Sequence, residues 1–117
     1  MNKKIKTELY KLREDAESAS ELHKTTRKFA DASQKFLDAV NLYGVAAHDA
    51  RNSSDVDPSG RYQYGSLRWL ASDVADVQRA AIVCCDKAYS LAWDTFAKET
   101  LAWDTYEDAL SKENNND

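Results

Sequence analysis

The chain has 117 residues, of which 43% are hydrophobic and 31% are charged, with a formal net charge of −4. This size and composition exclude a multidomain or disordered protein and predict one folded domain with a modest core. With only 3 Gly and 1 Pro, a turn-rich β fold is disfavoured and a few long helices are expected. No apolar run approaches the roughly 18 residues of a membrane span, and no apolar segment follows the basic start, so we expect a cytoplasmic protein.

A stripe of apolar or small residues predicts a long amphipathic helix over about residues 2–51. Its middle is made of small side chains, so a neighbouring helix can either approach closely there or insert a large side chain. Gly44 is the expected kink, and Ser18–Ser20 is an alternative break point. The stripe advances in steps of three and four through Ile5, Leu9, Leu12, Ala16, Ala19, Leu22, Thr26, Phe29, Ser33, Phe36, Val40, Tyr43, Ala47 and Ala50.

Residues 52–65 contain the only proline and two of the three glycines, which predicts a loop. Ser66 is the expected N-cap of a second helix over about 66–111. Residues 112–117 are expected to form a disordered polar tail, which leaves one helical domain over 1–111. The inward stripe of the second helix begins with Leu67, Leu70, Val74, Val77, Ala81, Cys84, Ala88 and Leu91, which makes Cys84 a core residue and Cys85 a flanking one.

Two long helices around one loop predict an all-α, antiparallel helical hairpin. If the chain folds about Pro58, Trp93 lies near His23 and Trp103 lies near Glu14. The net charge is +2 over residues 1–51 and −6 over residues 52–117, so the two halves attract each other. Because a hairpin alone buries only one face of each helix, we expect it to complete a four-helix bundle by dimerisation or by docking on a partner.

The second helix contains a near-duplicated hexapeptide, LAWDTF at residues 91–96 and LAWDTY at residues 101–106. Ten residues advance a helix by about 1,000°, or about 80° short of whole turns, so the two tryptophans face different directions. Either both cover a wide apolar face inside a bundle, or one stays exposed as a protein-binding anchor. A chance duplication is the third alternative. The candidate interaction residues here are Trp93, Phe96, Trp103 and Tyr106.

A second candidate patch interleaves arginine with aromatic residues at the end of the loop. It consists of Arg61, Tyr62, Tyr64, Arg68 and Trp69. These aromatic rings would either cap the open end of the hairpin core or anchor a protein partner. Stacking on nucleic acid is a weaker alternative, because an acidic chain is repelled by a phosphate backbone.

No residue pattern points to catalysis, to a metal or to a cofactor. His23 and His48 have no His, Cys or carboxylate at i+3 or i+4, the spacing that a helical metal site requires. We therefore expect His23 to be a hydrogen-bonded interior residue. The neighbouring cysteines lack the C-x-x-C spacing of redox and zinc sites, and the chain has no glycine-rich phosphate loop.

These observations predict a non-enzymatic helical interaction protein: an adaptor, an inhibitor or an assembly subunit that binds a protein partner, itself, or both. By analogy of class, phage-encoded antagonists of a host machine suit this description. Nucleic-acid binding through the Arg/Tyr loop, or through Lys3, Lys4 and Lys6, is an alternative function.

The hairpin outline is also similar to that of the WXG100 proteins, which are secreted two-helix hairpins with a Trp-x-Gly turn. The comparable place reads Tyr62-Gln63-Tyr64-Gly65, with Tyr where that family has Trp. The family's export motif, a Tyr followed four residues later by an acid, is not met at Tyr106, because Leu110 occupies that position. This resemblance implies a secreted hairpin as a further alternative.

Overall fold

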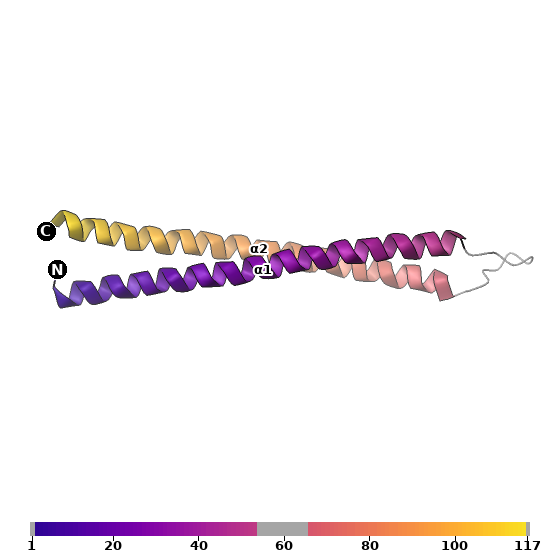
Figure 1. The fold of residues 1–117 in the computed structure, drawn as a ribbon, viewed down its shortest axis with the longest axis horizontal. Coiled ribbons are helices and arrows are strands. Elements are labelled where there is room, and N and C mark those ends of the chain that lie inside the picture. Colours follow the sequence, from indigo (N-terminus) through magenta and orange to yellow (C-terminus); the bar gives the residue numbers. More distant parts are fainter. Residues whose placement is uncertain (1, 54–65, 117) are drawn as a thin grey trace, which may run out of the picture. The chain divides into compact units, whose positions relative to one another are not determined.

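The computed structural model describes the backbone of residues 2–53 and 66–116, and the side chains of residues 2–49 and 72–115. Two helices account for this part of the chain: α1 spans Lys3–Ser53 and α2 spans Ser66–Asn116. They run antiparallel as a hairpin, and the described residues include no strand (Figure 1). The predicted all-α helical hairpin is therefore confirmed.

The helix ends follow from local chemistry. The side-chain oxygen of Asn2 accepts a hydrogen bond from the backbone N–H of Ile5 at 2.9 Å, which caps the start of α1. No break occurs at Ser18–Ser20, because α1 is continuous through them. At the other end, α2 continues to Asn116, so residues 112–116 are helical where a disordered tail was predicted. No Gly or Pro follows residue 111 to stop the helix.

The hairpin divides into two compact units, and both helices contribute to each. Unit 1 comprises Met1–Ala30 and Ala88–Asp117, and unit 2 comprises Asp31–Lys87. Each unit has its own seam, which we define as the line of residues through which its two helix segments face each other.

The seam of unit 1 consists mostly of small side chains. Ala30, Ala88 and Ala92 form its buried apolar cluster, against which Tyr89 packs. Because these side chains are so short, the two helices can approach closely, as predicted for the middle of α1. The remaining buried residues of this seam are Leu9, Ala16, Thr26 and Thr95.

The seam of unit 2 also depends on a close approach. Gly44 lies against Gln78, and a Cβ atom at Gly44 would stand only 2.5 Å from the Gln78 Nε2 atom. Glycine at this position therefore leaves space for the Gln78 side chain, which also donates a hydrogen bond to Asn41 at 3.3 Å. The buried residues of this seam are Val40, Ala47, Val74, Ala81 and Cys85.

The predicted inward stripes are wrong by one residue at several positions. In unit 1, Leu22, Phe29 and Leu91 are exposed, and His23, Ala30 and Ala92, one residue later, face the other helix. The same shift occurs in unit 2, where the exposed side chains are Phe36, Tyr43, Val77 and Cys84. The physical reason is steric, since helices that pack this closely accommodate alanine, glycine or threonine at the seam and push larger rings to the flanks.

The burial of the two cysteines is the reverse of the prediction. Cys85 is buried in unit 2 and its thiol donates a hydrogen bond to the Gln34 Oε1 atom at 3.4 Å, whereas Cys84 is exposed. Burial raises the pKa of the Cys85 thiol, and the negative charges of Asp86 and Asp38 add to this effect.

Alkylation should distinguish these two thiols. Cys85 holds less thiolate at a given pH, because its pKa is raised, and it is shielded from reagent. We expect iodoacetamide near pH 8 to label Cys84 first, with Cys85 reacting fully only after denaturation, as peptide mass spectrometry would measure. Equal labelling rates for Cys84→Ala and Cys85→Ala variants would contradict this assignment.

The small seam of unit 1 predicts a size-dependent loss of stability. Replacing Ala88, which is buried, by Leu should lower the free energy of unfolding by about 1–3 kcal/mol, because the facing helix must move apart. The matched control is Ala97→Leu at an exposed position of the same helix, which should change it by less than about 0.5 kcal/mol. Urea unfolding followed by circular dichroism measures both.

Candidate protein-interaction site

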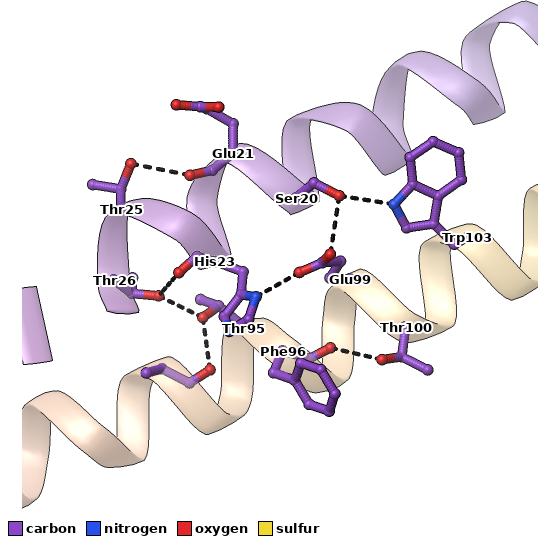
Figure 2. Close-up of polar contacts among 11 residues, drawn as sticks. Ser20, Glu21, His23, Thr25, Thr26, Thr95, Phe96, Glu99, Thr100 and Trp103 are labelled. Carbon is purple, nitrogen blue, oxygen red and sulfur yellow. Dashed lines mark hydrogen bonds and ion pairs between the residues drawn. The ribbon is translucent and has the colours of Figure 1, made fainter. Parts of the chain in front are cut away.

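A polar network that includes Trp103 crosses the seam of unit 1. The Trp103 Nε1 atom donates a hydrogen bond to Ser20 Oγ at 2.8 Å, and Ser20 donates in turn to Glu99 Oε1 at 3.1 Å. The second oxygen of Glu99 lies 2.6 Å from His23 Nδ1 (Figure 2). An ionised carboxylate only accepts hydrogen bonds, so His23 donates from Nδ1. His23 is thus hydrogen-bonded and largely covered, as the sequence predicted.

Two threonines form the buried part of the same layer. Thr26 Oγ1 and Thr95 Oγ1 lie 2.6 Å apart, and each is also placed to donate to a carbonyl of its own helix, that of His23 or that of Ala92. Each hydroxyl has one proton, so one threonine donates to the other, and the accepting threonine donates to its own carbonyl. Both hydroxyls stay satisfied in either arrangement, which makes their burial tolerable.

This network also sets the register of the hairpin in unit 1. Trp103 lies beside Ser20, so the predicted proximity to Glu14 is wrong. The prediction placed the turn symmetrically about Pro58, whereas the observed pairs place Thr26 opposite Thr95 and His23 opposite Glu99. Polar side chains inside a seam are stable only when hydrogen-bonding partners lie opposite them. The polar pairs therefore determine the register of unit 1, and a turn placed symmetrically about Pro58 does not.

Trp93 and Trp103 have different environments, in keeping with the different directions that the ten-residue spacing predicts. Trp103 is half-buried and packs edge-on against Tyr106, with ring centroids 6.0 Å apart. Trp93 is 68% exposed, and its ring packs edge-on against Phe96, which is itself 46% exposed, at 6.1 Å. Trp103 therefore helps to hold the hairpin together, whereas the ring of Trp93 is mostly exposed to solvent.

Trp93 and Phe96 border a shallow pocket of about 230 Å³. On its α1 side lies His23, whose ring packs against Phe96 with centroids 5.3 Å apart. The pocket is smaller than the 300–1,000 Å³ typical of small-molecule sites, and it suits an inserted side chain better than a cofactor. The full lining consists of His23, Arg27, Tyr89, Ala92, Trp93 and Phe96. We call these six residues the aromatic site.

The structure brings together only some of the predicted interaction residues. Trp93 and Phe96 belong to the aromatic site, and Trp103 and Tyr106 form a second pair in the same unit. Arg61, Tyr62 and Tyr64 lie outside the described residues.

The last two predicted residues fall in α2 itself. Arg68 and Trp69 belong to this helix, but their side chains also lie outside the part of the chain that is described. The second candidate patch therefore stays a prediction.

Sequence reasoning missed the α1 residues of the aromatic site and Tyr89 of α2. His23 was expected inside the hairpin, but neither its contact with Phe96 nor the place of Arg27 and Tyr89 was predicted. The heptad spacing of Tyr89, Phe96 and Trp103, at steps of seven, is a signal for one common face of α2 that would have grouped these rings.

Two further features concern other classes of site. In the described part of the chain, no group of three or more His, Cys, Asp and Glu side chains is arranged to hold a metal ion. Neither described helix contains a stretch that is long and apolar enough to cross a membrane.

Comparison with protein-family models, with curated proteins and with solved structures found no match to this chain.

The different roles of the two tryptophans predict different responses to loss of the indole N–H. Trp103→Phe removes the donor to Ser20 and should lower the free energy of unfolding by about 0.5–1.5 kcal/mol. Trp93→Phe at an exposed position is the matched control and should be close to neutral. Urea titrations of the two variants and the parent chain make the comparison, and equal losses would show that the network does not stabilise the hairpin.

Proposed function

We propose that this chain is a non-enzymatic protein–protein interaction module, an adaptor, inhibitor or assembly subunit that acts in the cytoplasm through its aromatic site. The observation that carries the proposal is the 68% exposure of Trp93 beside Phe96 on a helix whose other face is held by packing. Tryptophan is among the residues most enriched in binding hot spots, and an exposed indole supported by a neighbouring ring loses little conformational freedom on binding.

The shape and chemistry of the aromatic site favour a protein as its occupant. A partner side chain inserted into the pocket would contact Trp93, Phe96 and Tyr89. The imidazole of His23 is already hydrogen-bonded to Glu99, so the α1 side of the site is preorganised before a partner arrives.

A two-helix hairpin of this kind also leaves apolar side chains uncovered. In unit 1 Phe29 and Leu91 are exposed in addition to the aromatic site. We propose that a further helical surface, from a partner or from a second copy, completes a four-helix bundle by covering such side chains.

Affinity capture tests the aromatic site. The tagged chain, expressed in its native cells, should recover a partner protein that mass spectrometry identifies, and Trp93→Ala should weaken that recovery by about 30-fold or more. The matched control is Leu101→Ala, because Leu101 is exposed to a similar degree, 67%, on the same helix.

The control should keep the partner, and circular dichroism should show the same helicity in all three proteins. Recovery of the chain alone, or equal losses for the two substitutions, would count against the aromatic site as the anchor.

A further inference from the structure

α1 carries a second heptad stripe beside the one that faces α2. Its members are spaced three and four residues apart in alternation, and none of these members is charged. Large and small side chains alternate along its described part in unit 2, and all of them are exposed. The stripe, which we call the outer stripe, contains Ala32, Phe36, Ala39, Tyr43 and Ala46 in unit 2, and Leu22, Thr25 and Phe29 continue the same heptad spacing towards the N-terminus.

The outer stripe borders an apolar groove in unit 2. Phe36 and Tyr43 are 57% and 55% exposed, although they are among the largest apolar side chains of the unit. Beside them the groove, of about 340 Å³, is lined from α1 by Ala39, Val40 and Tyr43 and from α2 by Asp73, Val74 and Val77. Apart from the single carboxylate at its edge, this surface has the composition of a helix-packing face.

We propose that a second copy of this chain covers the outer stripe, with the α1 helices of the two copies packed antiparallel about a twofold axis between residues 37 and 38. In that register Phe36 of one copy lies against Ala39 of the other, and Tyr43 lies against Ala32. Each aromatic ring meets an alanine, so large side chains fill the space that small ones leave.

A second copy fits this surface because the alternation is complementary to itself. A twofold interface brings the same patch of both subunits together, so a stripe of alternating ring and methyl must match its own reverse. This one does, because Ala32, Phe36, Ala39 and Tyr43 read as small, large, small and large in one direction and as the opposite in the other. The absence of charge at these stripe positions also means that two copies do not repel each other there.

A stable dimer needs a contiguous surface of standard size, about 800 Å² on each partner. The outer stripe and the groove beside it contribute exposed apolar side chains to such a surface, among them Phe36, Tyr43 and Val77. The inference rests on the part of the proposed function in which a further helical surface completes the bundle, but it concerns unit 2 and not the aromatic site.

Sedimentation equilibrium of the full chain at micromolar concentration tests the proposal. We expect the mass of two chains, and the double substitution Phe36→Glu with Tyr43→Glu should raise the dimer dissociation constant by about 100-fold or more. Both residues are exposed in the hairpin, so its helicity should be unchanged. Leu101→Glu in unit 1 is the control for adding a charge at an exposed apolar position, and it should leave the dimer intact.

Cysteine pairing tests the antiparallel register. In a background of Cys84→Ala and Cys85→Ala, a chain with Ala32→Cys mixed with a chain with Tyr43→Cys should form the mixed disulfide under mild oxidation. Each chain alone should not, because copies of the same position lie about 16 Å apart along the helices. A disulfide within either single population would refute the register.

Other outcomes separate this inference from the aromatic site. A single-chain mass at every concentration, or a dimer unaffected by the Phe36 and Tyr43 substitutions, overturns the inference. If Trp93→Ala loses the captured partner while the dimer persists, both proposals stand. If the dimer persists and no partner is recovered, the aromatic site fails and the outer stripe does not.

Discussion

The close approach of α1 and α2 along a seam of small side chains is the constraint on which the rest of this hairpin depends. Ala30, Ala88 and Ala92 are almost completely buried in unit 1, and Gly44 leaves space for Gln78 in unit 2. Among the described residues, no large side chain is fully buried. Contact between backbones and methyl groups therefore replaces the interlocking of leucines that usually holds a two-helix seam together. The larger rings, which do not fit between helices at this distance, occupy the flanks.

The polar layer of unit 1 complements this close approach. Thr26 and Thr95 are short enough for the seam and bond to each other, and His23 and Glu99 pair at its edge. A shift along the helices would separate these pairs, and a buried polar group left without a partner costs about 1–3 kcal/mol. The alanines allow the helices to pack closely, but they would do so in many registers. The polar pairs select one register among these.

The same constraint explains why the candidate interaction surfaces are aromatic. A seam that accepts only small residues leaves Trp93 and Phe96 in unit 1, and Phe36 and Tyr43 in unit 2, at the surface. Their exposure is unfavourable in an isolated hairpin and favourable for association, because each ring removed from water contributes apolar area. A chain built in this way is stabilised further by whatever covers these rings, and that is the basis of both proposals.

The sequence alone determined the elements and several directions within them. The shortage of Gly and Pro, with the one cluster of both at residues 52–65, predicted two helices and one connection, because breakers are needed wherever a helix ends. The ten-residue spacing of Trp93 and Trp103 predicted from helix geometry that the two side chains face different directions, and His23 was expected to form a hydrogen bond inside the hairpin. All of these follow from the backbone period or from the chemistry of one residue.

Only the tertiary structure decided which stripe faces inward. Apolar residues stand side by side on α1, as at Phe29 and Ala30, so steps of three and four fit two neighbouring stripes equally well. Hydrophobicity favoured the stripe with the larger residues, whereas close packing selected the stripe with the smaller ones. The same one-residue shift on α2 makes Cys85 the buried cysteine and Cys84 the exposed one. The pairing of Trp103 with Ser20 was likewise undetermined by sequence, because a register depends on contacts between residues 83 positions apart, which no local period encodes.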